Sequence, residues 1–435
     1  MIFLFFCLIS SFTTERLTFN NEAEWVPSIV VDDASKIHIA YRYPDQIRYI
    51  TDKTGSWVID SIMVSASLVS IAVTPAGTPH LAFEASDGDD EIYYATKVGA
   101  AWDIDTITNN AISSRCPSIA LTPDSIPHII YYDFEGGLSL RHADKEIGTW
   151  STEVIPGTSI ATYSSIAIDN NGGVHVAVVC GTYGGNREIV YANDTSGSWV
   201  STGVTGDALD DDFPSIAVDN NGYAHISYEK DDGADWELWY AENTTGSFVA
   251  QQLTNNVGMQ DGGYSSIAID GNGDAHIAYH EDHLVGDLIY LTNRSGSWET
   301  DTIFASFSNK TYSWVDRNIC IDKLGFVHAC FCNQLGGSGS QELYHAVRDE
   351  AVGIESPSFY ASSDEQCIYL QWSVNLDDAC LNSVITRKSH FENGNFIEVA
   401  RIPHSSSSPT PKTYSYRDKD VNPGMRYYYK LGIMD

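Results

Sequence analysis

One unit of sequence recurs seven times along this chain of 435 residues, and this repeat constrains the fold more than any other feature. In every copy a His stands ten positions after a Ser, or after an Asn in the last copy, and successive copies lie 42 to 52 residues apart. The Ser/Asn positions are Ser28, Ser70, Ser118, Ser165, Ser215, Ser266 and Asn318, and the His positions are His38, His80, His128, His175, His225, His276 and His328. A catalytic His is needed once, so a His present seven times predicts a packing or hydrogen-bonding role between strands.

Each copy has the pattern of four short strands. Residues 165–169, Ser-Ile-Ala-Ile-Asp, alternate branched apolar residues with small or polar ones, as strands with one buried face do. Asp-Asn-Asn-Gly then supplies turn residues, the His begins a return strand, and 188–193 predict a third strand. The fourth begins with an aromatic residue: Trp57, Trp102, Trp150, Trp199, Phe248 or Trp298. Units of 40 to 50 residues with four strands predict an all-β fold, a seven-bladed β-propeller over residues 12–350.

The seventh copy lacks a fourth strand, and the N-terminus has one to spare. Residues 11–18, Ser-Phe-Thr-Thr-Glu-Arg-Leu-Thr, align with 247–254, Ser-Phe-Val-Ala-Gln-Gln-Leu-Thr. We therefore expect the first strand of the chain to complete the last blade and close the ring, which removes two free sheet edges. The alternative is a linear array of hairpin units, which leaves the seventh copy incomplete.

Composition and the N-terminus bear on partners and compartment. The 58 acidic and 24 basic residues give a net charge of −34, which excludes nucleic acid and opposes binding to anionic bilayers. Residues 1–11 form an apolar run that is too short to span a membrane and resembles a secretory signal peptide. No other segment is apolar enough for membrane insertion, so we expect a secreted or cell-surface protein; its oligomeric state stays open.

The repeat stops near residue 350, and after a linker at 351–357 the pattern changes. A strand with Trp372, a second strand from Val384 and a Tyr-rich strand after the Asp420–Gly424 turn follow one another in 358–435. This order resembles a fibronectin type III module, which implies a β-sandwich. No segment matches the last strand of such a module, so we expect this second domain to be incomplete.

The expected binding face is the rim that carries the variable loops, which join the second and third strands of each blade and link successive blades. Aromatic residues recur just before the repeated Ser, and acidic segments lie nearby, a combination that suits a neutral sugar because rings stack on C–H faces and carboxylates accept hydroxyl hydrogen bonds. The alternative is that the aromatic residues plug the central channel. The candidate ligand-binding residues are Trp25, Tyr163, Phe213, Tyr264, Trp314, Asp211, Asp231 and Trp236.

No cofactor is expected, although the acidic loops could hold Ca²⁺ through carboxylate oxygens. None of them matches the Asp-x-Asp-x-Asp-Gly run of a calcium loop. The segment His280-Glu-Asp-His283 could supply metal ligands or be a solvated loop. No catalytic constellation stands out.

The unit Ser-Ile-Ala-x-Asp-x-x-Gly-x-x-His-Ile-Ala-Tyr resembles repeats of bacterial secreted propellers that fold like the fucose-specific lectins, and more distantly the Asp-box repeats of sialidases. The resemblance covers about 340 residues. It implies the propeller but not the sugar, since the Arg, Glu and Trp by which fucose lectins hold sugar do not map copy by copy, and one fold hosts many functions. We expect a non-catalytic glycan-binding or surface-adhesion protein whose partner is a glycan or a cell-surface protein. The alternatives are a protein-binding scaffold and an extracellular glycoside hydrolase or lyase, with Asp211 paired to Asp231 or Glu281.

Overall fold

The computed structural model describes residues 12–434 except 21, 45, 65, 87–88, 110–112, 135–136, 183–185, 232, 234, 257–260, 282–285, 306–310, 313–316, 324, 335–340, 350–359, 364–367, 377–381, 390–396, 404–407 and 421–426. The expected signal segment, 1–11, and the linker, 351–357, fall outside this part. Ser11–Asp349 form one compact unit, and Glu350–Asp435 belong to a second. All regular structure in the described residues is β-strand.

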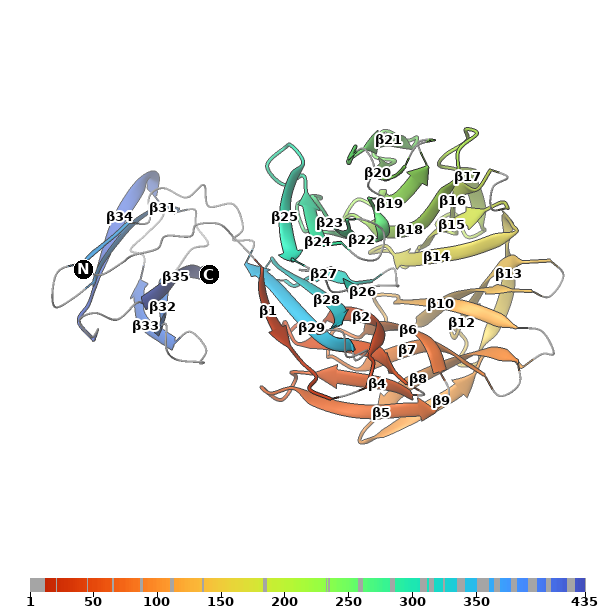
Figure 1. Cartoon of the computed structure of the whole chain (residues 1–435), viewed down its shortest axis with the longest axis horizontal. Coiled ribbons are helices and arrows are strands. Elements are labelled where there is room, and N and C mark those ends of the chain that lie inside the picture. Colours follow the sequence, from red (N-terminus) through yellow and green to blue (C-terminus); the bar gives the residue numbers. More distant parts are fainter. Residues whose placement is uncertain are drawn as a thin grey trace. The chain divides into compact units, whose positions relative to one another are not determined.

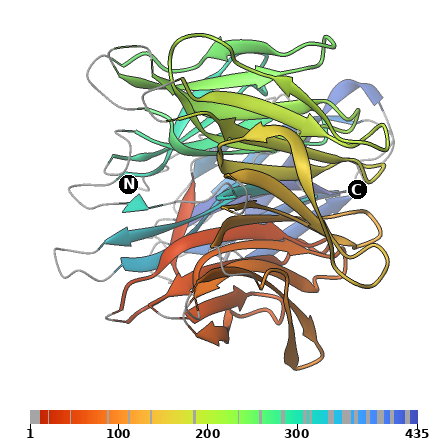
Figure 2. The same ribbon diagram turned by 90° about the vertical axis from the view of Figure 1, so that its right-hand side faces the viewer.

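Six consecutive four-stranded antiparallel sheets make up most of the first unit, each with its strands in chain order (Figure 1). Figure 2 shows the sheets fanned one beside the next. The strands are β2–β5 (Trp25–Val31, Ile37–Tyr43, Gln46–Thr51, Val58–Val64), β6–β9 (Ala66–Val73, Pro79–Ser86, Asp90–Val98, Ala101–Thr106), β10–β13 (Ser114–Leu121, Pro127–Asp133, Ser139–Asp144, Ser151–Ser159), β14–β17 (Ala161–Ile168, Val174–Cys180, Glu188–Asn193, Val200–Gly203), β18–β21 (Asp211–Val218, Ala224–Asp231, Trp236–Glu242, Val249–Gln252) and β22–β25 (Gly263–Ile269, Ala275–His280, Leu288–Thr292, Glu299–Phe304).

The seventh sheet combines the end of this unit with its beginning. It contains β26 (Thr311–Tyr312), β27 (Ile319–Ile321), β28 (Phe326–Gln334), β29 (Gln341–Asp349) and β1 (Thr13–Arg16). β1 lies beside β29 (Figure 1) and pairs with it antiparallel. In this pairing Thr13 lies opposite Val347. The seven sheets are the blades of a seven-bladed β-propeller, numbered below from β2–β5 as blade 1 to this sheet as blade 7.

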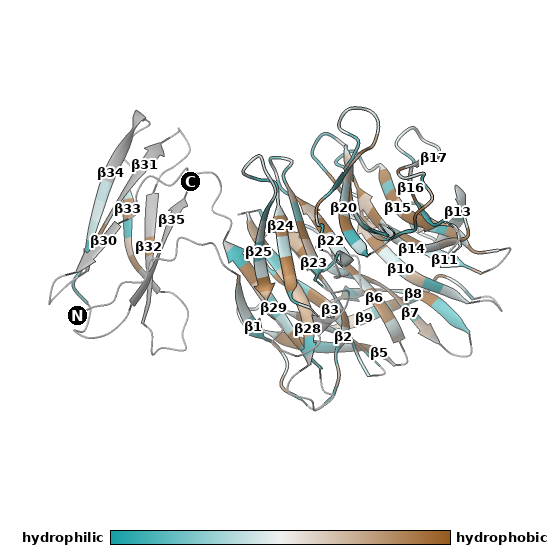
Figure 3. Cartoon of the chain, turned by 45° about the horizontal axis from the view of Figure 1, so that its top comes forward, coloured by the Kyte–Doolittle hydropathy of each residue, from teal (hydrophilic) through white to brown (hydrophobic). Residues whose placement is uncertain are grey.

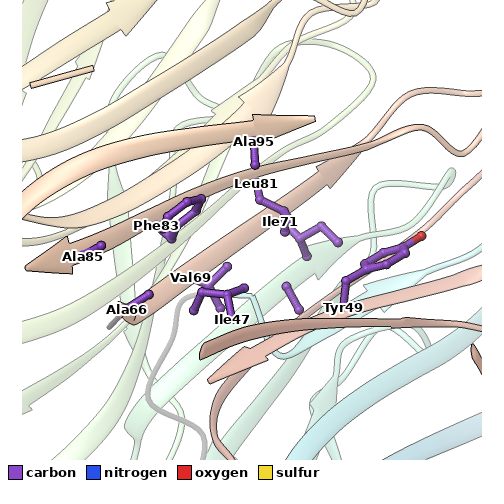
Figure 4. Packing of buried hydrophobic residues seen from close by; sticks show 10 residues of the cluster. Ile47, Tyr49, Ala66, Val69, Ile71, Leu81, Phe83, Ala85 and Ala95 are labelled. Carbon is purple, nitrogen blue, oxygen red and sulfur yellow. The ribbon is translucent and has the colours of Figure 1, made fainter. Parts of the chain in front are cut away.

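The core consists of seven hydrophobic clusters, one between each pair of neighbouring blades. Figure 4 shows the cluster in which Ile47 and Tyr49 of blade 1 face Val69, Ile71 and Phe83 of blade 2. Another cluster joins blade 7 to blade 1 through Leu343, Cys330 and Ile39. Hydrophobic and hydrophilic residues are therefore interspersed along the strands (Figure 3), since each sheet must present apolar side chains to its neighbours.

The aromatic residue that precedes or begins the outer strand of each blade packs on the blade before it. Trp102 lies 5.5 Å from Tyr49, centroid to centroid, and its Nε1 donates to Oδ2 of Asp60 at 3.1 Å. Blade 1 makes the same contacts with blade 7, because Trp57 lies 5.7 Å from His345 and donates to Oε1 of Glu15 in β1 at 3.2 Å. Blade 1 thus meets blade 7 as any blade meets the one before it.

The second unit contains two three-stranded antiparallel sheets. One has the order β30 (Tyr360–Ser363), β31 (Ile368–Leu376) and β34 (Ser408–Asp418). The other has the order β33 (Ile397–Pro403), β32 (Asn382–Ser389) and β35 (Tyr427–Met434).

Candidate functional site

The seven repeated His residues are buried in hydrogen-bonded pairs within their own blades. In five blades Nδ1 lies 2.5 to 2.7 Å from the hydroxyl of a Tyr on the third strand, as in His80 and Tyr94. In the other two blades the partner is a second His, as in His128 and His142 at 2.9 Å. Each pair links two strands inside the sheet, so these His residues serve the fold rather than a ligand.

The repeated Ser residues link one blade to the next. Oγ of Ser70 accepts a hydrogen bond from the backbone N–H of Ile119 in the following blade at 3.3 Å, and Oγ of Ser165 accepts one from Ile216 at 3.2 Å. We predict that Ser70→Ala lowers the free energy of unfolding by about 1 to 2 kcal/mol, because the Ile119 N–H stays buried without its acceptor. Urea unfolding measures the loss, with the exposed turn variant Ser56→Ala as the control. Equal midpoints for the two variants would contradict this role.

Just before the repeated residue, the innermost strand of each of the first six blades shifts register. The shifts lie at Trp25/Ser28, Ala66/Val69, Arg115/Ser118, Thr162/Ser164, Asp212/Ser215 and Gly263/Ser266. Such β-bulges re-aim side chains and commonly lie beside binding sites. The backbone at Phe213 and Tyr264 has a positive φ of 47° and 52°, an uncommon conformation for aromatic residues. The bulges thus set the direction of side chains at the variable rim.

Three aromatic side chains from three successive blades meet at these bulges. The ring centroid of Phe213 lies 4.3 Å from that of Tyr163 and 4.2 Å from that of Tyr264. We call Tyr163, Phe213 and Tyr264 the aromatic row. Phe213 lies between the two Tyr rings. Tyr163, at one end of the row, is 40% exposed.

Two buried carboxylates lie beside the aromatic row. Asp212 of β18 and Glu229 of β19 are directly opposite in the register and are called here the acidic pair. Nη1 of Arg187 contacts Oδ2 of Asp212. Burial raises the pKa of Asp212 to about 7; Arg187 lowers it and the charge of Glu229 raises it. Burial also raises the pKa of Tyr163 and of Tyr264, and the acidic pair raises both further.

The rim of blades 2 and 3 carries further polar and aromatic groups. At the bulge of blade 3, the N–H of Cys116 donates to Oε2 of Glu84 at 3.1 Å, and its Sγ donates to Oη of Tyr132 at 3.4 Å. The Tyr132 ring lies 5.7 Å from that of Phe134, which is 40% exposed. In blade 3 the position two residues before the repeated Ser is Cys116, where blades 4 to 6 have the aromatic residues of the row. The aromatic pattern of the sequence therefore did not single out this position.

The other predicted residues lie around the row with partners of their own. Asp211 is buried with Oδ1 3.2 Å from Nζ of Lys230, and burial raises its pKa to about 6. Oδ1 of Asp231 accepts the N–H of Gly233 at 2.7 Å. The ring of Trp236 lies 5.8 Å from the guanidinium of Arg187. Trp25 is half-buried opposite Arg42 at the start of β2, and Trp314 lies outside the described residues.

Glu281 directly follows β23 in blade 6, whereas Asp211 and Asp231 lie in blade 5. Asp212 and Glu229 lie opposite each other in β18 and β19, a pair that the sequence did not single out. The signal for Glu229 is its place four residues after the repeated His225, the position that Glu84 holds after His80.

In the described part of the chain, no group of three or more His, Cys, Asp or Glu side chains is arranged to hold a metal ion. His283, one of the two His residues of the possible metal segment, lies outside that part. The cysteines Cys116, Cys180, Cys320, Cys330 and Cys332 are free thiols. Among the described residues, no helix has the length and apolarity needed to cross a bilayer.

Neither protein-family models nor curated proteins match this chain. Among solved structures, it is similar to a protein of unknown function from Dyadobacter fermentans, with 12% identity, 77% of this chain and 97% of the other covered, and a TM-score of 0.47. An ulvan lyase bound to a GlcA–Rha3S repeat has 13% identity over 64% of this chain and 78% of its own, with a TM-score of 0.44. The Aleuria aurantia lectin in complex with α-methyl-L-fucoside has 13% identity over 68% and 98%, with a TM-score of 0.44. Similarities this distant say nothing about what this chain binds or catalyses.

Proposed function

We propose that this protein binds glycans, without turning them over, at the variable rim of blades 4 to 6. The aromatic row beside the acidic pair is the observation that carries this proposal. An exposed Tyr ring stacks on the C–H face of a sugar, and carboxylates accept hydrogen bonds from its hydroxyls.

We predict that Tyr163→Ala weakens glycan binding at least about tenfold, because truncation of an aromatic residue that dominates binding costs about 2 kcal/mol or more, and about 1.4 kcal/mol corresponds to tenfold. The full chain is first screened on a glycan array, with Ca²⁺ and again with a chelator, and the affinity for the best ligand is then measured by calorimetry. Tyr223→Ala is the matched control, since Tyr223 is 38% exposed but lies in a turn of the opposite rim. Absence of binding to every glycan, or equal affinities of the two variants, would refute the proposed site.

A second candidate is a glycoside hydrolase or lyase that uses the acidic pair. The favouring observation is the pKa of about 7 at Asp212, a value that suits proton transfer near neutral pH, next to a second carboxylate. Product release from bound oligosaccharides, abolished in Asp212→Asn, would establish catalysis. Saturable binding without product over long incubation would establish the lectin-like function.

We further propose that β1 closes the ring, that the protein is secreted, and that the second unit is a fibronectin type III-like domain. The pairing of β1 with β29 supports closure, the apolar run at 1–11 supports secretion, and the strand orders β30-β31-β34 and β33-β32-β35 support the sandwich. Loss of glycan binding on chelation would assign Ca²⁺ to the acidic loops.

A further inference from the structure

A second exposed aromatic ring lies on the variable rim next to the aromatic row, in blade 3. Phe134, in the loop between β11 and β12, is 40% exposed, the same fraction as Tyr163 of the row. Ile160, in the link between blades 3 and 4, is 41% exposed. We call Phe134, Ile160 and Tyr163 the exposed strip.

A backbone hydrogen bond joins the two segments that carry the exposed strip. The N–H of Ala161 donates to the carbonyl oxygen of Leu138 at 3.1 Å. Leu138 lies in the same loop as Phe134, and Ala161 lies between Ile160 and Tyr163. The backbone at Ile160 has a positive φ of 56°, a strained conformation for a β-branched residue and one that is often found at ligand sites. The three exposed side chains therefore come from segments that lie side by side.

The side chain of Tyr132 is a neighbour of both exposed rings. Its ring centroid lies 5.7 Å from that of Phe134. Burial and the thiol of Cys116 raise the pKa of Tyr132, and the charge of Tyr163 raises it further. Tyr163 is thus close enough to act electrostatically on a residue that packs on Phe134.

We propose that the exposed strip holds successive sugars of a linear glycan chain, rather than one terminal sugar. The inference rests on the proposed glycan-binding function and specifies its ligand class. The Tyr163 and Phe134 rings each offer a face on which one sugar stacks, and Ile160 adds apolar surface. A chain makes the second stacking contact within one complex, without a further loss of translational freedom, so it binds more tightly than its monosaccharide.

Calorimetry on the full chain with three pairs of probes tests this dependence on chain length. The pairs are glucose with cellotetraose, mannose with a β-1,4-linked mannose tetramer, and N-acetylglucosamine with its β-1,4-linked tetramer. We expect at least one tetramer to bind at least about tenfold more tightly than its monosaccharide.

Phe134→Ala removes the second ring and keeps Tyr163. We expect it to weaken binding of that tetramer at least about fivefold, and to leave the unfolding midpoint and the affinity for the monosaccharide unchanged. Phe19→Ala is the matched control, because Phe19 is 75% exposed in the link between blades 7 and 1, outside the exposed strip, and should leave both affinities unchanged. Tyr163→Ala should weaken binding of the monosaccharide and the tetramer alike.

Equal affinities for the monosaccharide and the tetramer in every pair that binds would overturn the inference and leave the glycan-binding function standing. An unchanged tetramer affinity in Phe134→Ala would do the same. Binding of none of the six probes would also overturn it, and the glycan array would then decide the proposed function alone.

Discussion

Removal of residues 1–18 is expected to lower the free energy of unfolding of the propeller by about 4 kcal/mol or more. The truncation strips the edge of β29 and breaks the ion pair between Arg16 and Glu342, whose Nη2 and Oε1 lie 2.6 Å apart. Glu342 is 1% exposed, and loss of the partner of a buried charge costs about 3 to 5 kcal/mol. The truncation also removes Leu17 from the core, for about 1.5 to 3 kcal/mol.

Denaturant unfolding of three proteins measures this contribution: the full chain, a truncation of 1–11 that keeps β1, and the truncation of 1–18. We expect the first two to agree and the third to unfold at a lower midpoint. A synthetic peptide of residues 11–20 should restore part of the lost stability, because it can pair with the free edge of β29. Equal midpoints for the two truncations would show that β1 does not close the ring.

Much of the blade architecture follows from the repeat, because most repeated residues hold equivalent contacts from one blade to the next. The match of 11–18 to 247–254 illustrates this. Phe12 packs on Tyr290 as Phe248 packs on Tyr191. Oγ1 of Thr18 accepts the N–H of Leu343 as Oγ1 of Thr254 accepts that of Leu238. Where two residues are in contact in one copy, the residues at the same two repeat positions of another copy are therefore expected to be in contact as well.

The aromatic row was predictable for the same reason, since Tyr163, Phe213 and Tyr264 share one repeat position. The acidic pair was not. The bulge between Asp212 and Ser215 changes the register there, and neighbouring strand residues point to opposite faces, so the sequence does not show which of Asp211 and Asp212 faces the row. Contacts such as that of Arg187 with Asp212 join different blades through variable loops, where the repeat gives no guide.

Acid is expected to cancel the stabilisation that His80 provides. Burial lowers the pKa of His80 in the folded protein to about 4, from an ordinary value of 6.5. As the pH falls below 6.5 the unfolded chain therefore binds a proton before the folded one, and stability is lost until the pH reaches about 4. The loss is on the order of 3 kcal/mol. Buried carboxylates act in the opposite direction, because the raised pKa of Asp212 and of Glu24, each about 7, makes acid favour the folded state.

A comparison between two blades isolates the His effect from these carboxylates. The turn of blade 4 places Oδ2 of Asp169 at 3.4 Å from Nε2 of His175, and this carboxylate raises the pKa of His175 against the effect of burial. Blade 2 has Thr74 where blade 4 has Asp169, so His80 has no such compensation. Between pH 7 and 4, the stability advantage of the wild type over His80→Gln should therefore shrink by about 3 kcal/mol, and its advantage over His175→Gln by clearly less. Both variants carry the same carboxylates, so their effect cancels in each difference. Equal pH dependence of the two differences would show that the turn Asp does not set the proton affinity of the repeated His.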